Sequence, residues 1–240
     1  MDNGTHATVF IADDDDHTRS AIEKTVRSIG LRAEAFSSID TLIDRAGDQP
    51  GCIILDLRDH TLAAFATLEK RGCQLPVIVV TGQYDVATTV QVMRAGALNV
   101  LGRPLNDQAL IDDVHRAIVH DRAQRRRTAE IRELQQRYFR LTRREREVMA
   151  LVSAGGSNRR VGTTLGIAER TVKAHRAQVV QKMKAASLVD LIHMARDLAG
   201  ASAARRKKPI TPAGLQTVTP SPGTTVGARA VTPRPERLRP

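Results

Sequence analysis

Short apolar runs alternate with helical patterns through the first half of the chain. Three of the five runs are almost entirely apolar, which is typical of parallel strands covered on both faces. Strands and helices in alternation predict an α/β fold with a doubly wound parallel sheet, which binds ligands at the carboxyl ends of its strands. The expected strands are Thr8 to Ala12, Leu31 to Phe36, Cys52 to Leu55, Pro76 to Val80 and Leu98 to Leu101. The expected helices are Thr18 to Ile29, Ser38 to Ala46, Leu62 to Lys70, Val86 to Ala95 and Asp107 to His120.

Only helical patterns follow in the next part of the chain. Thr142 and Glu145 have the spacing of a capping box and directly precede apolar positions, so a helix begins there and ends near Ser153. Ser157 caps a second helix, and the last helix runs from Leu188 to Ala199. With the helix between them, these segments predict a compact all-α unit of four helices.

The third of these helices, Glu169 to Lys184, has a core face and a basic face. Val172, Val179 and Met183 fall together when residues are placed about 100° apart. A short helix and Gly166 precede it, which indicates a helix-turn-helix whose second helix lies in the DNA major groove. A surface helix with a solvated basic face is the plainer alternative. The face opposite the core holds Arg170, Lys173, Ala174, Ala177, Gln181 and Lys184.

A charged helical pattern joins the two halves. Ile131, Leu134, Tyr138 and Leu141 form one apolar seam, which we interpret as a short linker helix that pairs with its copy in a dimer. A solvated connector is the alternative, because a coiled coil needs three or four heptads. The expected domains are 6–121, the α/β domain; 122–140, the helical linker; 141–199, the helix-turn-helix domain; and 200–240, a disordered tail rich in proline and threonine.

Charge divides the chain into an acidic front and a basic back. Residues 1–121 hold 11 Lys and Arg against 18 Asp and Glu, a net charge of −7. Residues 122–200 hold 18 against 7, a net of +11, and residues 201–240 hold 8 against 1, a net of +7. Double-stranded DNA is therefore the expected partner of the basic C-terminal part. A cation or a phosphoryl group is the expected ligand of the acidic N-terminal part.

The remaining composition favours the cytoplasm. The chain has two cysteines without metal-ligand spacing, no signal-peptide pattern and no apolar run of membrane-spanning length. We expect a cytoplasmic protein that has no membrane partner. Aromatic residues are scarce, which disfavours a stacking surface for single-stranded nucleic acid.

Carboxylates gather where the first and third strands are expected to end. Asp13 and Asp14 follow the first strand and Asp56 follows the third. Carboxylates held together repel one another, so a hard cation such as Mg²⁺ is expected among them. Asp15 and Asp16 are better explained as caps of the first helix, whose N-terminus favours negative charge.

A hydroxyl and a cation complete this set, because the fourth strand is followed by Thr81 and the fifth by Arg103. Such a set can stabilise a phosphoryl group on a carboxylate. In order and spacing, four motifs make residues 8–121 resemble the receiver domain of two-component response regulators, which has a flavodoxin-like fold. The motifs are FIADDDD, IILDLR, VIVVTG and LGRPL.

That resemblance implies a role for each polar residue of the site. Asp56 is the implied phosphoacceptor, Thr81 and Arg103 the switch and phosphate-coordinating residues, and Asp13, Asp14, Asp56 and the backbone carbonyl of Arg58 the ligands of Mg²⁺. Two features depart from the family. Arg103 stands in place of the usual lysine, and the loop after Asp56 lacks the family's Met-Pro and glycine.

Residues 141–198 resemble the LuxR-type DNA-binding domain of the FixJ subgroup. The similarity lies in the stretches LTRREREVM, SNRRVG and ERTVKAHRAQVVQKMKAASL. It implies that Lys173 and Ala174 face bases, whereas a packed histidine is as good an explanation of His175 as a DNA contact. Ala168 departs from the serine that usually caps the recognition helix. The expected DNA-binding residues are Asn158, Arg160, Arg170, Thr171, Lys173, Ala174, His175, Arg176 and Ala177.

Together these features predict a DNA-binding response regulator that a sensor histidine kinase phosphorylates on Asp56. The expected partners are the kinase, DNA, a second copy of the chain when active and, as a candidate, RNA polymerase. We do not expect this protein to be an enzyme. The receiver should catalyse only its own phosphorylation and dephosphorylation. One alternative is a DNA-binding regulator whose degenerate receiver needs no phosphorylation. A more distant one is an aspartate-nucleophile phosphatase, with Asp14 as the nucleophile.

Overall fold

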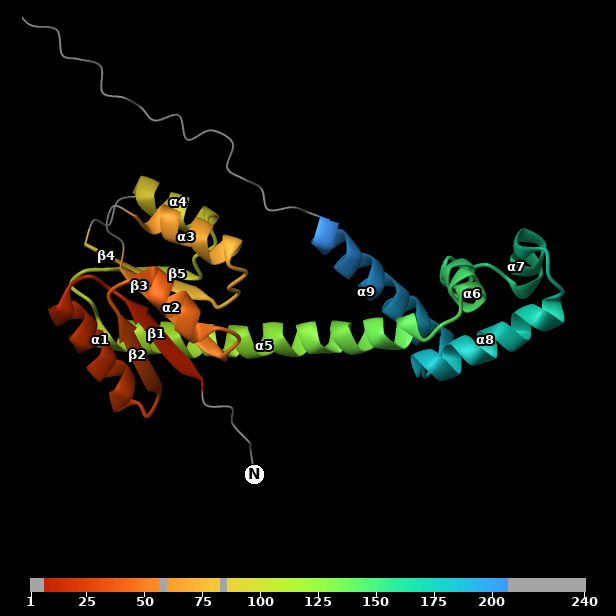
Figure 1. The fold of residues 1–240 in the computed structure, drawn as a ribbon, viewed down its shortest axis with the longest axis horizontal. Helices are drawn as coiled ribbons and strands as arrows, with labels where there is room; N and C mark the ends of the chain where they lie inside the picture. The colour runs from red at the N-terminus through yellow and green to blue at the C-terminus, as the bar shows by residue number, and fades with distance from the viewer. Residues whose placement is uncertain (1–6, 57–59, 83–85, 207–240) are drawn as a thin grey trace, which may run out of the picture. The chain divides into compact units, whose positions relative to one another are not determined.

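The computed structural model describes residues 7–56, 60–82 and 86–206, with side chains up to residue 201. Its first part is a parallel sheet of five strands in the order β2-β1-β3-β4-β5 (Figure 1). The doubly wound α/β fold is therefore confirmed. The strands are β1 (Thr8–Ala12), β2 (Arg32–Phe36), β3 (Gly51–Asp56), β4 (Val77–Thr81) and β5 (Asn99–Gly102).

Helices cover both faces of this sheet. Helices α2, α3 and α4 pack on one face through residues such as Leu42, Phe65 and Val92. Helices α1 and α5 pack on the other through residues such as Ile22 and Leu110. Burial on both faces explains why the central strands are apolar throughout. The helices are α1 (Asp16–Ser28), α2 (Ile39–Ala46), α3 (Thr61–Lys70), α4 (Val86–Arg94) and α5 (Asp107–Phe139).

Gly51 marks a close approach at the start of β3. A Cβ atom here would lie 1.8 Å from the backbone oxygen of Thr8 on β1, so only glycine fits. The Gly51 N–H donates to the buried carboxylate of Asp121 on α5 at 3.0 Å. Arg125 binds the same carboxylate and also donates to the backbone oxygens of Asp48 and Gln49. These hydrogen bonds hold the amino end of the sheet against α5.

Helix α5 continues without a break through the expected linker. Asn106 caps its start, and the helix extends for 33 residues to Phe139. Leu134 and Leu141 are buried, and Tyr138 packs beside them, in a cluster formed with Met149 and Met183 of the C-terminal helices. The interpretation of the seam as a dimer contact is therefore wrong, because the C-terminal core of the same chain covers it.

Four further helices form the C-terminal part. The capping box at Thr142 and Glu145 is present, and Ser157 accepts a hydrogen bond from the Arg160 N–H as expected. The last helix continues past the expected end at Ala199 to Arg206. Residues 200–206 are rich in alanine, the residue with the highest helix propensity. The helices are α6 (Arg143–Ser153), α7 (Asn158–Leu165), α8 (Glu169–Met183) and α9 (Leu188–Arg206).

The rest of the expected tail, residues 207–240, lies outside the described residues. Among the helices that the structure does describe, none combines the length and the apolar character that crossing a membrane requires.

Candidate functional site

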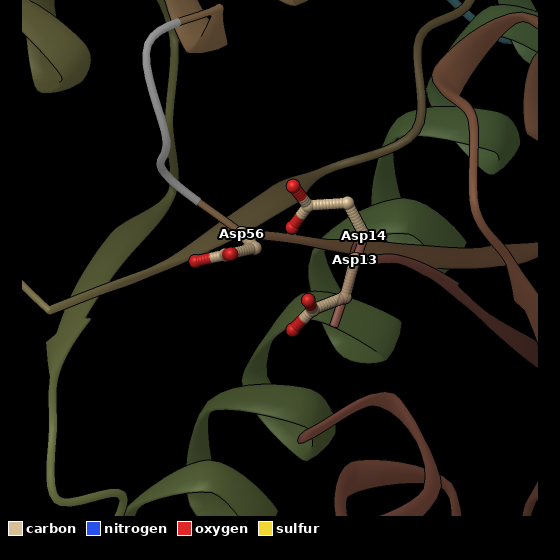
Figure 2. Close-up of side chains that lie close together, drawn as sticks. All are labelled: Asp13, Asp14 and Asp56. Carbon is tan, nitrogen blue, oxygen red and sulfur yellow. The ribbon is translucent and has the colours of Figure 1, made fainter. Parts of the chain in front are cut away.

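Three carboxylates meet at the carboxyl ends of β1 and β3. The two strands are neighbours in parallel register, with Ala12 opposite Leu55, so the residues that follow come side by side. One carboxylate oxygen each from Asp13, Asp14 and Asp56 lies within 4.8 Å of the others (Figure 2). Oxygen ligands at this spacing suit a hard divalent cation, and two of the carboxylates come from adjacent residues. The structure thus brings together the three side chains that the sequence pointed to.

The cluster has a buried side and an open side. The side chains of Asp13 and Asp56 are only 1% and 5% exposed, whereas Asp14 is exposed to solvent. The Asp15 N–H donates to Asp13 Oδ1 at 2.8 Å, which fixes one oxygen of that carboxylate. A cation bound here would have access to solvent on the Asp14 side. Arg58, whose carbonyl the family resemblance adds to the ligands, lies outside the described residues.

The adjoining strands bring Thr81 and Arg103 to the same edge of the sheet. Thr81 is the last residue of β4 and is buried, and its backbone oxygen accepts a hydrogen bond from the Arg103 N–H at 2.9 Å. The Arg103 guanidinium reaches back into the pocket, where it contacts both Asp13 and Asp56. Mutual repulsion among the carboxylates is thereby reduced. The guanidinium thus joins the carboxylates at this edge of the sheet.

Sequence reasoning missed Thr18 as part of the pocket. The Arg103 guanidinium donates to Thr18 Oγ1 at 2.8 Å, although 85 positions separate the two residues. Thr18 lies in the first turn of α1, which Asp15 caps by accepting from the Thr18 N–H. The available signal was its place just after β1, since the start of the following helix lies at the carboxyl end of the sheet. Asp15 is the cap of α1, and Asp16, its first residue, pairs with Arg19, in agreement with their expected role.

A helix-turn-helix is present in the C-terminal part. Gly166 ends α7 in the left-handed conformation, with φ of 65°, and α8 begins three residues later. Gly162 lies against this turn, where an added Cβ would be 2.7 Å from the Ile167 backbone oxygen. Val161 of α7 and Val172 of α8 are buried together with residues of α6. The turn between the two helices is therefore short and tightly packed.

Helix α8 presents the faces that the sequence indicated. Val172, Val179 and Met183 are buried, as expected. Ala168 stands at the N-cap without a side-chain hydrogen bond, so the first turn of α8 lacks a side-chain cap. Of the expected DNA-binding residues, Arg160, Arg170, Lys173, Ala174 and Ala177 are exposed, and Asn158, Thr171, His175 and Arg176 are half-buried.

Two side-chain contacts hold α8 on its neighbours. Arg176 donates to Asn158 Oδ1 of α7 at 2.6 Å, so these two expected phosphate contacts are bonded to each other. Lys182 Nζ lies 2.7 Å from both carboxylate oxygens of Glu145 on α6. Burial alone would raise the pKa of Glu145, but hydrogen bonds from Lys182 and from the Thr142 N–H hold it below its ordinary value. The contact with Lys182 was not expected from the capping-box pattern.

Comparison with known proteins agrees with both halves of this description. The family model of the response regulator receiver domain matches residues 9–115, and the model of the luxR family of bacterial regulatory proteins matches residues 140–195. The chain is 37% identical over 198 residues to nodulation protein W of Bradyrhizobium diazoefficiens, covering 81% of this chain and 87% of that protein. The chain belongs to the two-component response regulators of the FixJ type.

Other response regulators support the same assignment over most of the chain. The transcriptional regulatory protein FixJ of Rhizobium meliloti is 34% identical over 195 residues, which is 80% of this chain and 96% of that protein. The solved structure of the response regulator StyR superposes with a TM-score of 0.68 at 32% identity and covers 80% of this chain. This response regulator is a two-component transcription regulator with a LuxR-type DNA-binding domain.

Proposed function

We propose that Asp56 accepts a phosphoryl group from a sensor histidine kinase and that this controls DNA binding through α8. The observation that supports this most directly is the convergence of Asp56 with Asp13 and Asp14 beside the Arg103 guanidinium. In the proposed step, an oxygen of Asp56 attacks the phosphorus atom of the kinase phosphohistidine. The nitrogen–phosphorus bond breaks as the acyl phosphate forms.

Mg²⁺ is the metal that this pocket fits. Asp13, Asp14 and Asp56 would hold it, with the backbone carbonyl of Arg58 as a further ligand. The ion would neutralise negative charge on the transferring phosphoryl oxygens. In the same scheme, the Thr81 hydroxyl and the Arg103 guanidinium bind the phosphoryl oxygens once Asp56 is modified.

The face of α4 and β5 is the proposed output of the receiver. Val86, Val90 and Met93 on α4 are exposed, with exposed fractions of 81%, 42% and 43%. Single exposed apolar residues are common, but three on one short helix favour a partner surface. A shift of Thr81 at the start of the loop before α4 would change this face on phosphorylation. We propose that two copies then associate through it, which places two recognition helices on one DNA site.

The exposed face of α8 is the proposed reading surface. Lys173 and Ala174 would contact base edges in the major groove, with Arg170 and Ala177 beside them. Thr171 and His175, and Arg160 at the start of α7, would contact phosphates, and the bonded pair Asn158 and Arg176 would fix the register.

The proposed domains are 6–121 for the receiver, 122–140 for the linker and 141–199 for the DNA-binding domain. The proposed site of action is the cytoplasm. RNA polymerase is the proposed protein partner at the promoter.

The test uses the full chain, a small phosphodonor such as acetyl phosphate, and Mg²⁺. Intact-mass measurement should show one added phosphoryl group, and the Asp56→Asn variant should show none. Binding to DNA sites selected from a random pool should tighten with phosphorylation in the wild type only. If Asp56→Asn binds DNA as the phosphorylated wild type does, phosphorylation has no part in control.

The alternative of a phosphorylation-independent receiver has one observation in its favour. Arg103 already bonds Asp56 in this structure, so the acceptor is partly neutralised before any phosphoryl group arrives. This alternative predicts the same DNA affinity with and without phosphodonor. The comparison of the two affinities therefore decides between the two functions.

A further inference from the structure

The Arg103 guanidinium lies between two carboxylates of the candidate metal cluster. Its Nη2 lies 3.2 Å from Asp56 Oδ1 and 3.3 Å from Asp13 Oδ2. Both of these carboxylates belong to the candidate metal cluster, and both are almost completely buried. One nitrogen of the guanidinium thus connects the ends of β1 and β3.

A third contact holds the guanidinium in this position. Its other terminal nitrogen, Nη1, donates to Thr18 Oγ1 at 2.8 Å. Thr18 donates in turn to Asp15 Oδ2 at 2.5 Å, and Asp15 is fixed as the N-cap of α1. The planar fork of arginine makes these separate contacts with two nitrogens, which the single nitrogen of lysine does not provide. The arrangement therefore depends on arginine at this position.

We propose that Arg103 is a built-in competitor of Mg²⁺ in the receiver pocket. In the metal-free protein the guanidinium neutralises Asp13 and Asp56, and it withdraws from Asp13 when the ion binds. Two cations in contact with the same buried carboxylate repel each other, so full contact by both is unfavourable. Mg²⁺ must displace the contacts of Arg103 with the carboxylates. Phosphorylation of Asp56 therefore requires a higher Mg²⁺ concentration than it would without these contacts.

This inference concerns the same pocket and rests on the proposed function. Its first test is the affinity of the full chain for Mg²⁺, measured by titration calorimetry at constant ionic strength. Wild type is compared with Thr18→Ala, Arg103→Lys and Arg103→Ala. Thr18→Ala retains the arginine and removes only its outer anchor, so it remains informative if a change at Arg103 impairs folding. Arg45→Lys serves as the matched control, since Arg45 pairs with Glu34 on the surface.

Each pocket variant should bind Mg²⁺ more tightly than wild type. We expect a gain of about threefold for Thr18→Ala and about tenfold for Arg103→Lys, because the ion then breaks fewer hydrogen bonds to charged groups. Arg45→Lys should not change the affinity. Unchanged or weaker binding by Thr18→Ala and Arg103→Lys would overturn the proposal. Tighter binding by Arg103→Ala alone would also overturn it. The affinity for Mg²⁺ would then depend on the positive charge at position 103 and not on the hydrogen bonds of the guanidinium.

Phosphorylation is measured separately on the wild type at saturating Mg²⁺. Labelling of Asp56 without the expected affinity changes rejects the competition and leaves the proposed function in place. Affinity changes without any labelling support the competition and reject phosphorylation control. The two proposals therefore fail in different experiments.

Discussion

Replacement of Glu145 by glutamine tests how the recognition helix is held. Glutamine keeps the size of the side chain and an oxygen that can accept from the Thr142 N–H, 2.7 Å away. It removes the negative charge that binds Lys182 at 2.7 Å from both oxygens. The main loss is therefore the ion pair between α6 and α8, while the capping box stays largely intact.

The size of the effect follows from the burial of the two partners. The Glu145 side chain is 6% exposed and that of Lys182 is 31% exposed. Breaking a fully buried pair costs about 3–5 kcal/mol, and an exposed pair contributes about 0–1 kcal/mol. Because the ammonium keeps some access to water, we expect glutamine to lower the free energy of unfolding by about 2 kcal/mol. This is a substantial share of the stability of a typical domain, about 5–15 kcal/mol.

Urea unfolding of the full chain, followed by circular dichroism, measures this loss. Hydrogen exchange of amides in α6 and α8 assigns it to the DNA-binding domain. Glu147→Gln is the matched control: Glu147 pairs with Arg143 and Arg144 at a more exposed site, so its loss should stay below about 1 kcal/mol. An effect of Glu145→Gln no larger than that of the control would refute the reasoning.

The same residue predicts a pH dependence. The pKa of Glu145 in the folded protein lies below its ordinary value of 4.5, so its contribution is fully present above pH 4.5. The contribution is lost as the pH falls from there through the lowered pKa, because the protonated acid no longer binds Lys182. The stability difference between wild type and Glu145→Gln should therefore shrink below pH 4.5 and be constant near neutrality.

Three further substitutions probe the DNA-binding domain. Gly162→Ala should lower the stability by about 1 kcal/mol, because strain of about 1–3 kcal/mol against the Ile167 oxygen outweighs the gain in helix propensity; a stabilised variant in urea unfolding would contradict this. Ala168→Ser should add a side-chain cap to α8 and raise the unfolding free energy by about 1 kcal/mol, and the absence of any gain in the same assay would show that the first turn is already satisfied. Lys173→Ala should weaken DNA binding with some loss of sequence preference, measured on selected and scrambled sites. A uniform loss on both would make Lys173 a phosphate contact.

The fold was predictable because burial leaves a strong pattern in the sequence. Apart from the ends of α5 and α9, the expected helices and strands of the α/β domain and the capping residues of the C-terminal helices agree with the structure to within two residues. The carboxylate cluster was predictable for a related reason. Residues that follow neighbouring parallel strands meet at one edge, so Asp13 and Asp56 had to come close.

The failures have a common physical cause, which is that tertiary contacts decide between equally good local patterns. The seam at Leu134 and Tyr138 fits a dimer contact and an intramolecular core equally well by spacing, and the C-terminal core covers it. Glycine inside a helix, such as Gly162 of α7, ordinarily only lowers the stability of that helix. Gly162 instead allows the Ile167 carbonyl to approach where a methyl group would collide.

Helix α8 combines tertiary contacts at one end with a local sequence feature at the other. Its carboxyl-terminal half is fastened by Lys182 to Glu145 and by an Arg137 side chain that donates to the Met183 oxygen at 3.3 Å. Its amino-terminal turn has no side-chain cap. The residues proposed to read bases, Lys173 and Ala174, lie next to that less constrained turn. The ion pair with Glu145 therefore serves folding, and the exposed side chains of Lys173 and Ala174 are proposed to serve recognition, so Glu145→Gln should act on stability and Lys173→Ala on DNA affinity.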